Sequence, residues 1–272
     1  MFTELNSILN ESPENFSTGE FVLLSDRQSD ASFLIHHFLG FYLRAGCQVC
    51  FVGLAQSLSH YSAVSQRLGV SLSQAKEKGQ LVFLEGLNES LSILNPDGAR
   101  PGSQAMDFLR NPGAGLRSLF QSVHSSLTSQ GAESGSLRPP ALLVDDVSVL
   151  QSLGVSVDSV LDFSHYCRAL VCSQLKGNVV MLLRCDGEDD DDDTGSEESS
   201  ERLLRGLTHQ CSLSLSVQGL PTGYCRDIHG QLEVWDRRRQ ADGQDQKKTT
   251  FQYKVHDKGA SFFAPGTSSA VL

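Results

Sequence analysis

The stretch "FVLLSDRQSDASFLIHHFLGFYLRAG", residues 21–46, decides the fold that the rest of the chain must fit. It begins with an apolar run, 21–26, which is typical of a buried strand. The run that follows the loop places apolar residues on one helical face, and Gly46 stands where helices commonly end. A strand, a short loop and a helix in this order predict the first unit of an α/β sheet. In many α/β proteins such a loop binds phosphate.

The same alternation continues outward along the chain. Further apolar runs predict buried strands at 47–54, 79–86, 141–150 and 178–186. Amphipathic segments predict helices over 58–69, 73–78, 115–130 and 157–177, and a short one near 201–208. Continuous apolar strands that alternate with helices predict a mostly parallel central sheet flanked by helices. Three β-rich segments near the end, 211–219, 230–238 and 250–263, predict antiparallel hairpins at one edge of the sheet.

The length predicts a single domain, residues 1–272, and the stretches rich in Gly, Ser and Pro predict surface insertions near 88–114 and 131–140. The net charge of −10 comes from one segment, because 186–201 holds ten of the 32 acids and leaves 22 acids against 22 bases elsewhere. Such a run repels itself and buries no apolar surface, so we expect a disordered acidic loop. A solvated insertion and a tail for a basic partner are both open readings of it.

The composition argues against membrane insertion and against metal chemistry. No apolar run reaches the roughly 18 residues of a membrane span, and the N-terminal segment lacks the charge and apolar pattern of a signal peptide. Seven scattered cysteines predict reduced thiols in an intracellular protein. Cys47 and Cys50 form a C-x-x-C pair, but no second pair accompanies them, so we expect core packing of Cys50 and no zinc. No metal or cofactor is predicted.

The loop in the opening stretch departs from the phosphate-binding pattern G-x-x-x-x-G-K-[ST]. With Ser32 in the hydroxyl position, Ser25 and Asp30 stand at the two glycine positions and Ala31 stands at the lysine position. Asp26 and Asp30 place negative charge where a triphosphate would bind. Asp30 is also suited to cap the following helix. We therefore expect a loop that is filled by its own carboxylate and does not bind nucleotide.

A second nucleotide-binding element would be a carboxylate after an apolar strand. The run "ALLVDD" supplies Asp145 and Asp146. Helix capping by these acids and Mg²⁺ binding are equally compatible with the pattern.

Two stretches resemble the RecA-like ATPases, in particular their clock-protein branch. The segment 47–86 is similar to the second and third strand units of that branch, and 250–266 is similar to its closing hairpin. The resemblance implies a pair of catalytic glutamates after the second strand, where this chain has Ala55 and Gln56. Neither residue can act as a general base, so no catalytic residue is predicted.

Longer runs resemble the Elongator complex protein 6 family of vertebrates, among them "HHFLGFYLRAGCQVCFVGL" (36–54), "GQLVFLEGL" (79–87) and "SFFAPGTSSAVL" (261–272). The similarity covers nearly the whole chain and weakens across 88–140, the acidic loop and 237–248. It implies a RecA-like, non-catalytic subunit that forms a hetero-hexameric ring with Elongator subunits four and five. It further implies that the ring binds tRNA and docks on the catalytic subcomplex that modifies wobble uridine, in cytoplasm and nucleus.

A basic cluster is a candidate RNA contact. Arg237, Arg238 and Arg239 follow Trp235, and Lys247 and Lys248 come next in a polar loop. A solvated loop is the competing interpretation. Two other functions also stay open: an active NTPase with an unconventional pocket at a subunit interface and Asp145 on Mg²⁺, and a scaffold that uses the acidic loop to bind another partner.

Overall fold

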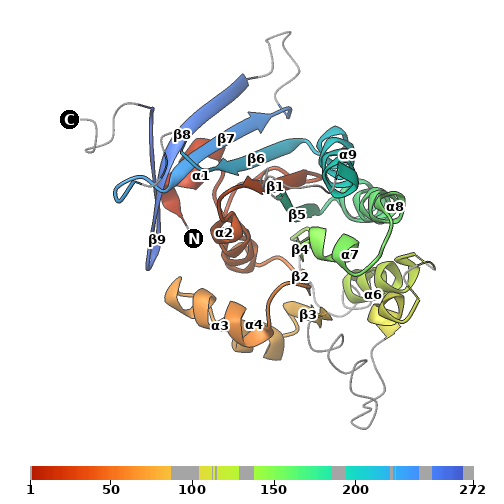
Figure 1. Ribbon diagram of the computed structural model, residues 1–272. Coiled ribbons are helices and arrows are strands. Elements are labelled where there is room, and N and C mark those ends of the chain that lie inside the picture. Colours follow the sequence, from red (N-terminus) through yellow and green to blue (C-terminus); the bar gives the residue numbers. More distant parts are fainter. Residues whose placement is uncertain are drawn as a thin grey trace.

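In the computed structural model the chain forms one sheet in the order β3-β2-β4-β5-β1-β6-β7-β8-β9 (Figure 1). The structure describes residues 2–86, 104–111, 113, 115–128, 138–185, 194–220, 223, 225–238 and 247–265. The strands are β1 Phe21–Arg27, β2 Val49–Gly53, β3 Leu81–Glu85, β4 Ala141–Asp145, β5 Asn178–Cys185, β6 Leu213–Gln218, β7 Gly230–Asp236, β8 Lys247–His256 and β9 Gly259–Phe263. Along this order, neighbouring strands pair in parallel from β3 through β2, β4, β5 and β1 to β6. From β6 through β7 and β8 to β9 they pair antiparallel. The predicted fold class is confirmed.

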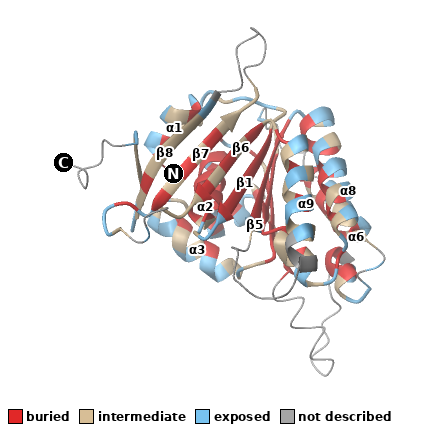
Figure 2. Ribbon diagram, turned by 45° about the horizontal axis from the view of Figure 1, so that its top comes forward, coloured by how far each residue is buried: buried red, intermediate tan, exposed pale blue. Residues whose placement is uncertain are grey.

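Helices cover both faces of the parallel part of the sheet (Figure 2). One face carries α1 Thr3–Leu9, α2 Ser32–Arg44, α3 Leu58–Arg67 and α4 Leu72–Glu77. The other carries the 3₁₀ helix η2 Gln104–Leu109, α6 Arg117–Thr128, α7 Ser148–Ser152, α8 Val157–Cys167, the π-helix η4 Arg168–Gln174 and α9 Thr194–Gln210. Alternate residues of each strand point to opposite faces. Val22 and Leu24 therefore pack in the hydrophobic core between the sheet and α2, whereas Phe21 and Leu23 pack in the core between the sheet and helices α8 and α9.

Helix α2 is the central helix of its layer, because every residue from Phe33 to Leu43 is buried. It ends at Arg44, and Gly46 follows two residues later as the predicted stop signal, with a φ of 78° that glycine adopts with little strain. His37 is a packing residue: its Nδ1 accepts a hydrogen bond from the backbone N–H of Phe2 at 2.9 Å. The predicted core packing of Cys50 is confirmed, because this residue lies buried in β2.

Three sequence-based boundaries were wrong. The predicted strand 141–150 ends at Asp145, because the side chain of Asp146 accepts the N–H of Ser148 and the chain turns into α7. Part of the loop predicted over 88–114 is η2, whose Ala105, Met106 and Phe108 are buried. The end of the predicted acidic loop belongs to α9, which begins at Thr194. Acids near a helix N-terminus are favourable, so this segment is compatible with a helix.

The remaining insertions, 88–103, 131–137 and 186–193, lie outside the described residues. No helix in the described part of the chain is both long and apolar enough to cross a membrane. The β8–β9 hairpin closes one end of the sheet, and α1 lies against it (Figure 1). There, the backbone N–H of Phe262 donates to the carboxylate of Glu4 at 2.7 Å.

Candidate functional site at the carboxyl edge of the sheet

The loop between β1 and α2 lies at the carboxyl edge of the parallel strands, where α/β proteins commonly bind ligands. Two backbone N–H groups at the end of this loop donate to nearby carboxylates, one at the end of β1 and one in the loop. The N–H of Ala31 donates to Asp26 Oδ2 at 3.1 Å, and the N–H of Ser32 donates to Asp30 Oδ1 at 2.8 Å. The N-cap residue of α2 is Ala31 and not, as expected, Asp30. The side chain of Ala31 makes no capping hydrogen bond. Two amides that could bind a phosphate are therefore already hydrogen-bonded.

The residues at the glycine, lysine and hydroxyl positions of the degenerate phosphate loop bring no positive charge. Ala31, at the lysine position, is fully buried, and Ser25 is buried in β1. Ser32 is partly buried at the start of α2. Asp26 is only 3% exposed, and this burial raises the pKa of its carboxyl to about 6. A polyphosphate placed here would meet carboxylates where it needs cations.

Asp145 and Asp146 lie beside this loop at the end of β4, and the peptide bond that joins them is cis. Asp145 Oδ2 accepts the hydroxyl of Tyr61 at 2.8 Å, while its Oδ1 is buried and has no hydrogen-bond partner in the described part of the chain. Asp146 accepts the N–H of Ser148 at 2.7 Å. Burial raises the pKa of Asp145 to about 6 and also raises the pKa of Asp146.

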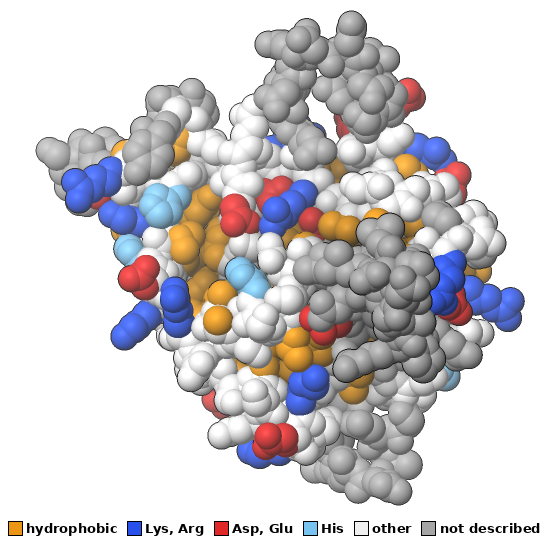
Figure 3. Space-filling view, turned by 60° about the horizontal axis from the view of Figure 1, so that its bottom comes forward, with side chains coloured by type: hydrophobic (Ala, Val, Ile, Leu, Met, Phe, Trp, Pro, Cys, Tyr) orange, Lys and Arg blue, Asp and Glu red, His pale blue; other side chains and the backbone are white. Residues whose placement is uncertain are grey.

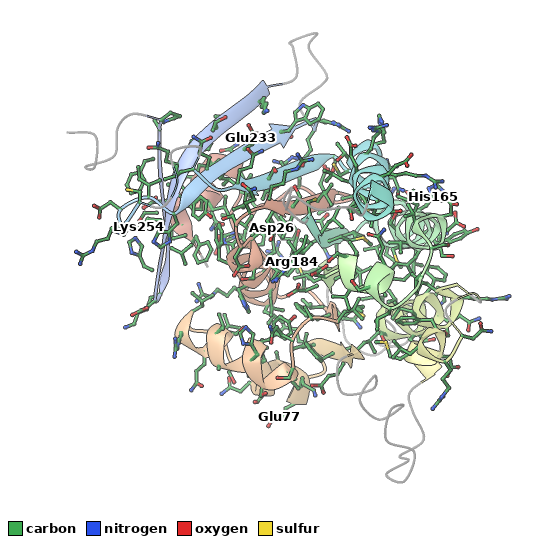
Figure 4. The ribbon with its side chains drawn as sticks, viewed as in Figure 1. Asp26, Glu77, His165, Arg184, Glu233 and Lys254 are labelled. Carbon is green, nitrogen blue, oxygen red and sulfur yellow. The ribbon has the colours of Figure 1, made fainter. Side chains whose placement is uncertain are left out.

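Arg184 connects the two groups of acids, and no sequence pattern pointed to this residue. It stands directly opposite Asp26 in the β1–β5 register. Its Nε lies 3.4 Å from Asp146 Oδ2, and its Nη2 lies 3.7 Å from Asp30 Oδ1. Figure 4 shows Asp26 and Arg184 close together below the central strands. One guanidinium thus joins the β1–α2 loop to the β4–α7 turn, in the region that a bound phosphate would need.

The segment after β2 also reaches this edge, as the resemblance implied. The N–H groups of Leu54 and Ala55 donate to the backbone oxygen of Asp145, at 2.6 and 3.3 Å. Neither Ala55 nor the exposed Gln56 brings a carboxylate. Glu85, at the end of β3, accepts the N–H of Leu58 at 3.2 Å and so helps to start α3. Among the described residues no cluster of His, Cys, Asp and Glu is arranged to bind a metal ion.

The candidate RNA contacts do not form one free basic surface within the described residues. Arg238 is only 10% exposed and is paired with Glu11 and with Asp236, the latter at 2.9 Å. Arg237 lies 4.1 Å above the ring of Trp235 and donates to the backbone oxygen of Thr208.

The two lysines of that cluster lie on β8 and not in a loop. Lys248 is 61% exposed and lies 2.9 Å from Glu233. Arg239 and the side chain of Lys247 lie outside the described residues. RNA contact by the exposed members stays a prediction, whereas Arg238 has a structural role in joining the N-terminal segment to β7.

These features define a RecA-like α/β protein whose phosphate-loop amides are bonded to its own carboxylates. The fold is shared with the uncharacterized protein PH0321 from Pyrococcus horikoshii, solved in complex with an unknown peptide. The two superpose with a TM-score of 0.62 at 12% identity, over 96% of each chain.

Sequence comparison then gives the family. Residues 2–257 match the family described as Elongation complex protein 6. The chain is 63% identical to Elongator complex protein 6 of Danio rerio and 49% identical to that of Homo sapiens, in both cases over 100% of each protein. A protein of the same name from Dictyostelium discoideum is 22% identical over 98% of each. The chain belongs to the Elongator complex protein 6 family.

Proposed function

We propose that this chain is a non-catalytic ring subunit of the Elongator complex. It assembles with Elongator subunits four and five into a hetero-hexamer that holds two copies of each. The ring binds tRNA, docks on the catalytic subcomplex and supports modification of the wobble uridine. The complex works in the cytoplasm and in the nucleus.

The β1–α2 loop is the observation that carries the non-catalytic part of the proposal. A nucleotide site of this class needs free backbone amides, a lysine and a hydroxyl for Mg²⁺. Here Asp26 and Asp30 accept the loop amides, and Arg184 bridges Asp30 and Asp146. A fold that retains this loop without its phosphate chemistry is suited to building an assembly, and full-length membership of the family supports the same role.

Nucleotide hydrolysis by this chain is the competing function, and one feature favours it. Asp145 Oδ1 is buried at the end of β4 without a hydrogen-bond partner in the described part of the chain, as an oxygen that awaits Mg²⁺ would be. The absence of a lysine at position 31 speaks against this role, because a phosphate loop of this class needs that positive charge.

tRNA binding tests the proposal. Subunits four and five are co-expressed with and without this chain, and the affinity of each product for tRNA is measured across a range of salt concentrations. The proposal predicts that tRNA affinity collapses when this chain is omitted. Equal affinity without the chain would contradict its role in the ring.

A further inference from the structure

A groove of about 570 Å³ opens between α2, α3 and the β8–β9 hairpin, beside the β1–α2 loop. We call it the hairpin groove, and its lining includes Phe33, His36, His60, Val64, Tyr253 and Asp257. Figure 3 shows hydrophobic side chains on this face between histidines, with acidic side chains next to them. Its volume is in the range of protein ligand pockets, and its lining comes from segments far apart in the sequence.

The floor of the hairpin groove is rigid and apolar. Phe33 of α2 and Tyr253 of β8 stack with their ring centroids 5.1 Å apart. The hydroxyl of Tyr253 is hydrogen-bonded to that of Ser29 at 2.7 Å, which fixes the ring against the β1–α2 loop. Val64 of α3 and Leu68, which follows the end of α3, are partly buried and also line the groove. An apolar surface held in this way needs no rearrangement to accept an apolar side chain.

One polar group in the hairpin groove lacks a partner. His36 is 6% exposed, and its Nδ1 is buried with no hydrogen-bond partner among the described residues. Its ring lies 5.8 Å from that of His60. Burial beside His60 lowers the pKa of His36 to about 4, so the imidazole is neutral at pH 7. Buried polar atoms are normally hydrogen-bonded, and this nitrogen is an unpaired polar atom beneath the surface of the groove.

Charge distinguishes between possible occupants. Among the described residues that line the hairpin groove, Asp30 and Asp257 are acidic, and none is lysine or arginine. Asp26 and Asp146 lie behind Asp30, and Arg184 is the cation that approaches both Asp30 and Asp146. This negative field repels nucleic-acid phosphates and attracts a basic side chain. It therefore favours a protein segment over RNA.

We propose that the hairpin groove is the docking site for an apolar segment that carries arginine or lysine and belongs to a neighbouring subunit of the ring. This inference rests on the proposed ring assembly and deepens it, because it names the contacting surface and the chemistry of the partner. Apolar side chains of the partner cover Phe33 and Val64, and the basic group lies between Asp30 and Asp257.

Charge reversal on the rim tests the docking site. Asp257→Lys lies in an exposed turn, so the chain keeps its fold, which thermal unfolding verifies. Val64→Ser is a second variant, which removes apolar contact from the groove wall and leaves its charge unchanged. Asp162→Lys is the matched control, since Asp162 is an exposed acid on α8, on the other face of the sheet. Each is co-expressed with subunits four and five, and the dissociation constant of ring assembly is measured at two salt concentrations.

We expect Asp257→Lys to weaken assembly by about tenfold and to make the dissociation constant depend less on salt. Val64→Ser should weaken assembly several-fold. Asp162→Lys should leave assembly unchanged. Normal assembly of both groove variants would overturn the docking site and leave the proposed function standing. Unchanged assembly with stronger tRNA binding by Asp257→Lys would overturn it too, and would make the hairpin groove a surface that faces RNA. If the wild-type chain does not assemble, the proposed function itself fails, and this inference fails with it.

Discussion

The Nε atom of Arg184 lies 3.4 Å from Oδ2 of Asp146, and this pair closes the carboxyl edge of the sheet. Asp146 is 3% exposed at its side chain, whereas Arg184 is 43% exposed. The guanidinium also approaches Asp30 at 3.7 Å. A region that could hold an anion thus holds a cation from the protein, with acids around it.

Removal of this cation should destabilise the fold. Arg184→Gln leaves Asp146 buried without its counter-charge, and we expect the free energy of unfolding to fall by about 1–2 kcal/mol, less than for a fully buried pair because Arg184 is partly exposed. Arg205→Gln breaks the exposed pair with Glu201 and is the control, with an expected loss below about 0.5 kcal/mol. Urea denaturation at pH 7 measures both. Equal losses for the two variants would show that Arg184 is not a structural counter-ion.

The buried carboxyl of Asp26 should make stability depend on pH. Its pKa is raised from 3.8 to about 6 by burial, so the folded state binds the proton more tightly than the unfolded state does. The stabilisation from that proton is present below about pH 4 and is lost as the pH rises through 6.

Asp26→Asn keeps an oxygen for the N–H of Ala31 and removes the titration. The free energy of unfolding of this variant minus that of the wild type should therefore rise between pH 4.5 and pH 7.5, by on the order of 1–3 kcal/mol. Urea denaturation across this range measures the difference. A difference that is flat with pH, or that falls, would contradict the burial of an ionisable Asp26.

Substitution by glutamine should lower the free energy of unfolding much more at Arg238 than at Lys248. Arg238→Gln leaves Glu11 and Asp236 without their partner, and we expect a loss of about 3–5 kcal/mol. Lys248→Gln removes an exposed pair with Glu233 and should cost less than about 1 kcal/mol. Thermal unfolding separates them. If Arg238→Gln instead lowers tRNA affinity of the ring at unchanged stability, its role is RNA contact.

Mg²⁺ and ATP should not stabilise the isolated chain. A ligand at about 100 times its dissociation constant stabilises the folded state by about 2.7 kcal/mol. We expect no shift of the unfolding midpoint with millimolar Mg²⁺–ATP, because the amides of Ala31 and Ser32 are hydrogen-bonded to carboxylates. An ATPase with an intact phosphate loop serves as the positive control. A saturable shift for this chain would favour the competing function.

Local patterns of apolar residues in the sequence predicted most of the fold. The apolar runs of the parallel strands and the continuous α2 pattern were readable because a strand or helix buried on both sides needs apolar residues throughout. The end of β4 was missed, because the apolar residues of α7 continue the strand pattern past two aspartates. The N-terminal extension of α9 was missed because its acids resemble those of a disordered loop.

Only part of the candidate site could be predicted from the sequence. The loop acids could be found from the spacing of a known motif, since Asp26, Asp30 and Ala31 lie within six residues of each other. Arg184 could not be found, because it meets Asp26 only through the pairing of β1 with β5. The hairpin groove depends in the same way on α2, α3 and β8 coming together, and Arg238 meets an acid 227 residues away. Such contacts are set by the order of strands and not by local sequence.

Ring assembly is measured by native mass spectrometry of the complex formed on co-expression with Elongator subunits four and five. We expect a hetero-hexamer that contains two copies of this chain. A complex of subunits four and five that forms without this chain, while the chain itself stays monomeric, would show that it is not a ring subunit.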